Sequence, residues 1–151
     1  YLRKLYLHNE LSCGKYKING RTLALQDIKQ PLFVVSTVKD HVAPWKSVYK
    51  IHQLTNTDIT YILTRGGHNS GIISEPGHKD RSYQMLLHRK NQKPLTTDKW
   101  QEKAGQYNGS WWLAWEKWLA DFSKGLIKPP AMGSKSYKSI CAAPGVYVLQ
   151  K

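Results

Sequence analysis

The sequence predicts an α/β fold in which parallel strands are joined by crossover helices, and three stretches carry this prediction. Residues 32–37, LFVVST, form an apolar run without alternation, which is typical of a parallel strand covered on both faces. Apolar and aromatic residues then recur at steps of three and four over residues 43–54, as in a helix. Residues 58–64, DITYILT, supply a second strand rich in β-branched and aromatic side chains. This order of strand, helix and strand predicts a βαβ unit.

Length and composition restrict the class of protein. The chain has 151 residues, of which 40% are apolar, so it can form a domain with its own core. No apolar run has the length of a membrane-spanning helix, and the basic start is not followed by a signal-peptide stretch. Cys13 and Cys141 match neither a disulfide framework nor a metal-binding motif, so we expect a cytoplasmic protein. Because the first residue is Tyr1 rather than Met, we expect a piece of a longer protein.

A net charge of +13, from 23 Lys and Arg against 10 Asp and Glu, calls for an anionic partner to be considered. The basic residues are scattered, with the densest cluster at residues 88–93, HRKNQK. The sequence contains no recognition helix, aromatic-basic platform or zinc-finger spacing, so we expect no nucleic-acid partner. A lysine-rich solvated surface is the preferred interpretation, and it is compatible with binding a polyanionic carrier such as coenzyme A.

The remaining segments suggest how the chain is organised. Residues 1–12 show helical spacing and are interpreted as the end of a preceding helical or cap segment. Residues 13–107 are assigned to the α/β domain; they begin with a hairpin at Asn19-Gly20 and contain a possible short helix near residues 83–88. Residues 108–151 are assigned to a Trp-rich helix and an extended tail that we expect to run over the surface.

The Trp-rich helix is predicted over residues 109–125, GSWWLAWEKWLADFSKG. Ser110 is the expected N-cap and Gly125 the expected C-cap. Four tryptophans, a leucine and a phenylalanine fall on one broad apolar face, so we expect this helix to pack against the domain.

An acid and a histidine follow the two predicted parallel strands. Asp40 comes after the first strand, and His68 comes after the second within the glycine-rich loop RGGHNSG. The carboxyl ends of parallel strands meet at one edge of a sheet, so the two side chains are expected to lie together. An acid that orients a histidine is two-thirds of a nucleophilic triad, although a structural turn pair is the alternative. No Gly-x-Ser-x-Gly or Gly-x-Cys-x-Gly elbow is present, and no metal site is expected.

Several motifs resemble the carboxyl-terminal part of polyhydroxyalkanoate synthases, in particular class I enzymes, which polymerise short 3-hydroxyacyl chains as a single type of polypeptide. The resemblance covers nearly the whole chain, and its elements are VKDHVAPWKSVY, GGHNSGIISEPG, RSY, NGSWWLAWEKWL and APGVYV. It implies a carboxyl-terminal portion of an α/β-hydrolase fold with a Trp-rich terminal helix. Two departures are Asn69-Ser70, where family members carry small apolar residues, and Gln84, where a Trp often follows SY.

By this resemblance Asp40 and His68 correspond to the triad aspartate and histidine, and the nucleophilic cysteine has no counterpart in this chain. The residues expected beside the pair or near the substrate are His41, Trp45, Gly67 and Asn69. The resemblance implies transfer of 3-hydroxyacyl groups, 3-hydroxybutyryl in particular, from coenzyme A thioesters to a growing polyester, without a metal or cofactor. It further implies a homodimer when intact, and a location in the cytoplasm on polyester granules. The chain alone is expected to be inactive, and to be marginally stable or to self-associate.

Two alternatives stay open from the sequence. The chain could be part of another α/β hydrolase, such as an esterase or a depolymerase, which a serine elbow upstream would favour. It could instead be a non-catalytic module whose basic surface and Trp-rich helix bind a granule or a partner.

Overall fold

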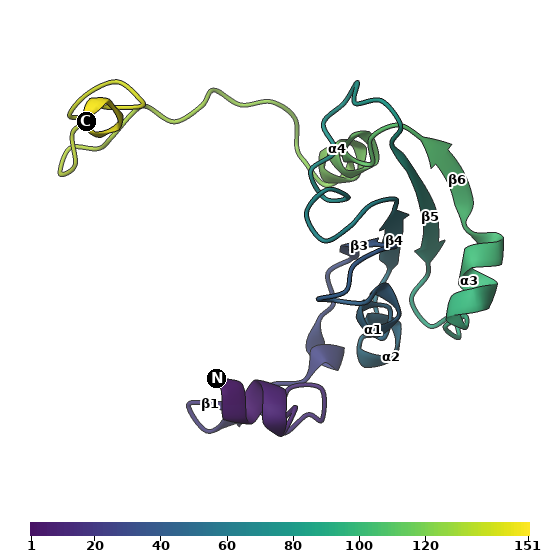
Figure 1. Ribbon diagram of the computed structural model, residues 1–151. Helices are drawn as coiled ribbons and strands as arrows, with labels where there is room; N and C mark the ends of the chain where they lie inside the picture. The colour runs from purple at the N-terminus through teal and green to yellow at the C-terminus, as the bar shows by residue number, and fades with distance from the viewer.

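The computed structural model describes residues 1–151, and its centre is a four-stranded mixed sheet in the order β3-β4-β5-β6 (Figure 1). Strands β3 and β4 are parallel, whereas β4–β5 and β5–β6 are antiparallel. The strands are β3 (Leu32–Thr37), β4 (Ile59–Thr64), β5 (Ser82–His88) and β6 (Gly105–Asn108). A mixed sheet flanked by helices agrees with the predicted α/β class, and the parallel β3–β4 pair confirms the βαβ prediction.

The side chains of β4 alternate between the two faces of the sheet, and each face has its own core. Ile59, Tyr61 and Leu63 pack on the side of α1 (Trp45–Val48) and α3 (Thr97–Lys103), where Trp100 is buried. Ile62 packs on the opposite side, in a cluster that includes Trp111. Burial on both faces explains why large β-branched, aromatic and aliphatic side chains occur at successive positions of β4.

Tyr61 links the sheet to the crossover. Its hydroxyl lies 2.8 Å from Ser36 Oγ and 3.1 Å from the Trp45 carbonyl oxygen, so it contacts both β3 and α1. Burial raises the pKa of Tyr61 to about 12, and the phenol therefore remains a neutral donor over the whole working range of pH.

The crossover is less regular than predicted. Instead of one helix over residues 43–54, the chain forms two short helices, α1 and α2 (Ile51–Leu54), separated by a turn at Tyr49-Lys50. Tyr49 is 5% exposed and donates from its hydroxyl to the Leu95 carbonyl oxygen, so the break places an anchored aromatic ring in the core.

The prediction of a short helix near residues 83–88 was wrong, because these residues lie in strand β5. Gln, Met and Leu are good helix formers, but β5 is hydrogen-bonded on both sides, to β4 and to β6. Helix α3 and strand β6 were not predicted at all. Thr96 caps α3 by accepting from the Lys99 N–H at 3.4 Å.

Helix α4 (Trp112–Asp121) is shorter than the predicted span of residues 109–125. Ser110 was expected as the N-cap, but the N-cap is Trp111. Ser110, one residue earlier, still accepts the Trp112 N–H at 3.0 Å and so satisfies a free amide at the helix start. Gly125 was expected as the C-cap, but the helix already ends at Asp121, and Phe122 is its C-cap. The expected apolar face is only partly covered: Trp111 is buried, whereas Trp115 is 41% exposed.

The two ends of the chain lie away from the sheet (Figure 1). At the start, η1 (Leu2–Leu7) is a π-helical turn, and β1 (Lys17–Ile18) and β2 (Arg21–Thr22) form the hairpin predicted at Asn19-Gly20. A 3₁₀ turn, η2 (Leu25–Asp27), leads into β3. The tail projects away from α4, rather than over the surface as expected, and ends near the 3₁₀ turn η3 (Tyr147–Leu149). None of the helices has the length and apolar character needed to cross a membrane.

A buried histidine predicts how stability depends on pH. His52 is 3% exposed, stacks on Tyr49 with ring centroids 4.1 Å apart, and faces His88 at 5.2 Å. Burial holds the pKa of His52 below its ordinary value, so the folded state favours the neutral ring. As the pH falls below about 6.5, the unfolded chain takes up a proton that the folded chain resists. The free energy of unfolding should therefore fall between pH 7.5 and pH 5.5.

Urea titrations at several pH values test this prediction. His52→Gln should show a flatter dependence of stability on pH than the parent chain. Some dependence should remain, because burial also holds the pKa of His88 below its ordinary value. Gln53→Ala, a change at the exposed neighbour on α2, is the control. Its free energy of unfolding should depend on pH as steeply as that of the parent chain. If the free energy of unfolding of His52→Gln fell with pH as steeply as that of the parent chain, His52 would not be a source of the pH dependence.

Candidate active site

Asp40 and His68 meet at the edge of the sheet where β3 and β4 end. The register pairs Thr37 with Thr64, so both strands finish at the same level. The loops continue this pairing, since the Lys39 N–H donates to the Gly66 carbonyl oxygen at 2.9 Å. Beyond this point Asp40 Oδ2 lies 2.9 Å from His68 Nδ1, as the spacing predicted.

The two oxygens of Asp40 have different partners. Oδ1 accepts the backbone N–H groups of Val42 at 2.9 Å and Ala43 at 2.8 Å, which makes a turn before α1. Oδ2 is left for His68. The pKa of Asp40 lies below its ordinary value, chiefly because of the Ala43 N–H and then because of the His68 hydrogen bond. The turn role and the role as partner of a histidine thus belong to the same ionised side chain.

This contact fixes the arrangement of the His68 ring. A carboxylate can only accept, so Nδ1 carries a proton, and in the neutral ring Nε2 is the acceptor. The His68 side chain is 49% exposed, whereas that of Asp40 is 9% exposed. The structure therefore presents a basic imidazole nitrogen supported by a largely covered carboxylate. This is the geometry of the acid–histidine part of a triad.

The loop that carries His68 is packed closely against the end of β3. Gly71 lies so near Thr37 that a Cβ atom at position 71 would be 2.6 Å from the Thr37 methyl carbon. The Gly71 N–H donates to the Gly67 carbonyl oxygen at 3.1 Å, closing a tight turn around His68. The close approach of Gly71 to Thr37 was not recognised from the sequence, because the contact joins residues far apart in the chain.

The other residues expected near the pair differ in exposure and in hydrogen bonding. His41 is exposed in the turn after Asp40, and Trp45 is 8% exposed within the core beneath that turn. The Gly67 N–H donates to Ser70 Oγ at 3.1 Å. Asn69 accepts two backbone N–H groups through its carbonyl oxygen, and its side chain is exposed. The polar pair Asn69-Ser70 therefore helps to shape the turn around His68.

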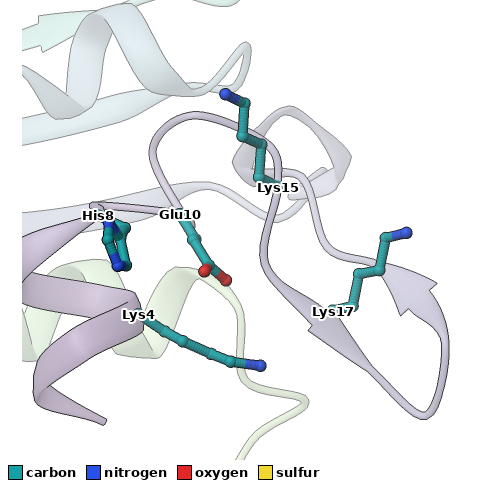
Figure 2. Close-up of a pocket in the computed structure, with 5 residues that line it drawn as sticks. All are labelled: Lys4, His8, Glu10, Lys15 and Lys17. Carbon is teal, nitrogen blue, oxygen red and sulfur yellow. The ribbon is translucent and has the colours of Figure 1, made fainter.

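A polar hollow lies elsewhere, in the amino-terminal segment (Figure 2). It has a volume of about 580 Å³ and is lined only by Lys4, His8, Glu10, Lys15 and Lys17. Figure 2 shows Glu10 turned towards the side with His8 and Lys4, while Lys15 and Lys17 extend away from it. It has no apolar wall and no residue of the Asp40–His68 pair. The structure brings together no group of three or more His, Cys, Asp or Glu side chains that could hold a metal ion.

Comparison with known proteins finds sequences similar to this chain. The chain is 30% identical over its whole length to the poly(3-hydroxyalkanoate) polymerase subunit PhaC of Rhizobium etli. It is 34% identical over 98% of its length to the protein of that name from Rhizobium meliloti, and 33% identical over its whole length to that of Cupriavidus necator. The chain is similar throughout to a part of poly(3-hydroxyalkanoate) polymerases. It spans about a quarter of these relatives, covering 23%, 23% and 25% of their lengths. No protein-family model matches the chain.

The Gly71–Thr37 contact yields a prediction about stability. Gly71→Ala should destabilise the fold by about 1–3 kcal/mol, because the added methyl group overpacks the site. Removing the opposing methyl group with Thr37→Ser should reduce this cost, so the two changes should be non-additive in urea unfolding. Gly67→Ala is the matched control, since a Cβ atom at position 67 would lie 3.7 Å from its nearest neighbour, Ser70 Oγ. Strict additivity of the two changes would show that the contact is not formed.

Proposed function

We propose that the chain is the carboxyl-terminal part of a polyhydroxyalkanoate synthase with an α/β-hydrolase fold. The intact enzyme transfers 3-hydroxyacyl groups, chiefly 3-hydroxybutyryl, from coenzyme A thioesters to a growing polyester and releases coenzyme A. The observation that carries the proposal is the 2.9 Å contact between His68 and Asp40 at the ends of two parallel strands. Whole-length similarity to named polymerases supports the choice of reaction.

In this mechanism His68 Nε2 accepts the proton of a cysteine nucleophile supplied by another part of the enzyme. The thiolate attacks the thioester carbonyl carbon, the bond from that carbon to the coenzyme A sulfur breaks, and an acyl-enzyme forms. His68 passes the proton to the departing coenzyme A thiolate, and then deprotonates the 3-hydroxyl group that attacks the acyl-enzyme. The new ester bond forms as the bond from the acyl carbon to the cysteine sulfur breaks, and His68 returns the proton to the cysteine thiolate. Asp40 holds the Nδ1 proton and stabilises the imidazolium form at each transfer.

The proposal extends to the setting of the enzyme. We propose a homodimer in the cytoplasm at the surface of polyester granules, with no nucleic-acid partner, metal or cofactor. Each substrate brings its own activated acyl group as a thioester, so acid–base and nucleophilic chemistry suffice for transfer. The 151-residue chain on its own, which has no cysteine elbow, is expected to show no polymerase activity.

The test uses the complete reading frame and measures coenzyme A release and polymer formation from 3-hydroxybutyryl-coenzyme A. His68→Gln removes the base, and Asp40→Asn removes the carboxylate that fixes the ring tautomer. Each should lower kcat by about 10⁴-fold or more, with little change in thermal stability.

His8→Gln is the matched control, because His8 lies in the amino-terminal hollow rather than beside Asp40. It should retain normal activity. Release of free 3-hydroxy acid without polymer would instead indicate a hydrolase. Full polymerase activity in His68→Gln would exclude the proposed role of the pair.

A further inference from the structure

The segment of the His68 loop that follows the histidine is held from the start of helix α4. The Trp111 indole N–H donates to the Gly71 carbonyl oxygen at 3.1 Å, and the Trp112 indole N–H donates to that of Ile72 at 3.0 Å. Ser110 Oγ donates to the Ser74 carbonyl oxygen. Three consecutive side chains, from the residue before the N-cap to the first residue of α4, therefore bind three carbonyl groups within four residues of the loop.

Trp111 is itself fixed to the sheet. Its side chain is 6% exposed, belongs to the core cluster with Ile62 and Tyr83, and stacks on Phe33 with ring centroids 6.3 Å apart. A buried indole that contacts β3, β4 and β5 has little freedom to move. Its N–H group therefore gives Gly71 a fixed point of attachment.

Gly71, which is held by Trp111, is connected to His68 by a short stretch of hydrogen-bonded backbone. Gly71 is three residues beyond His68, and its N–H donates to the carbonyl oxygen of Gly67, directly before the histidine. On the other side of the histidine, Lys39 binds Gly66. The loop is thus tied before His68 to the segment that follows β3, and after His68 to the start of α4, whereas the imidazole has Asp40 as its side-chain partner.

We infer that Trp111 and Trp112 are positioning residues for His68. They hold the loop at the distance from β3 at which Nδ1 meets Asp40. The catalytic consequence of this inference rests on the proposed function, but the geometric consequence does not. The amino-terminal end of the Trp-rich helix thereby acquires a role distinct from packing or interface binding.

Replacing both tryptophans with phenylalanine removes the two indole donors and keeps aromatic rings in place. In the full chain labelled with ¹⁵N-histidine, NMR reports which ring nitrogen of neutral His68 carries the proton, with His68→Gln providing the assignment. Trp111→Phe/Trp112→Phe should raise the fraction with the proton on Nε2 about fivefold, the factor expected for one typical hydrogen bond. In the complete enzyme the same change should lower kcat by roughly tenfold with KM unchanged.

The matched control is Trp115→Phe/Trp118→Phe, which makes the same chemical change later in α4, where the indoles do not bind the loop. It should leave the His68 tautomer unchanged. An equal shift in both double variants, or no shift in the first, would overturn the inference. If the first variant does not fold, the single variant Trp112→Phe tests the inference instead. It is expected to fold, because the Trp112 side chain is only partly buried. It should shift the tautomer about twofold, and no shift would overturn the inference. A shifted tautomer in this chain, together with no polymerase activity in the complete enzyme without substitutions, would refute the proposed function and leave the positioning role intact.

Discussion

The parallel pairing of β3 with β4 is the constraint on which the candidate site depends. Two parallel strands in register end at the same edge, so the loops that follow them begin side by side. A separation of 28 residues along the chain is thereby reduced to a 2.9 Å contact between Asp40 and His68. An antiparallel return would have placed the second loop at the far edge of the sheet.

The two faces of the sheet support different residues of this pair. The face that carries α1 and α3 buries Tyr49, Tyr61 and Trp100, which fix the crossover helices that follow Asp40. The opposite face buries Trp111, which is hydrogen-bonded to the loop that follows His68. Each catalytic candidate is thus supported from a different side, and the rigid sheet between the two cores relates them.

Local sequence signals predicted some elements of the fold, whereas elements that depend on contacts between distant segments could not be predicted. The hairpin at Asn19-Gly20 was predictable because both residues adopt positive φ angles, +49° and +78°, which this pair tolerates. Strand β5 was not, because its residues favour a helix in isolation and become a strand only through pairing on both sides. The break between α1 and α2 has a similar origin, since the buried Tyr49 ring is held by Leu95 from another segment.

The sequence by itself determined the parallel strand pair, the acid and histidine that follow it, and the likeness to a class of polymerase. These features depend on residue type and on spacing within one βαβ unit, which a single chain displays directly. Tertiary structure decided the antiparallel strands, the shortened helix α4, the close approach of Thr37 to Gly71 and the attachment of Trp111 to the His68 loop. These features join segments that are distant in sequence, and their geometry is set by packing and hydrogen bonding that no local pattern encodes.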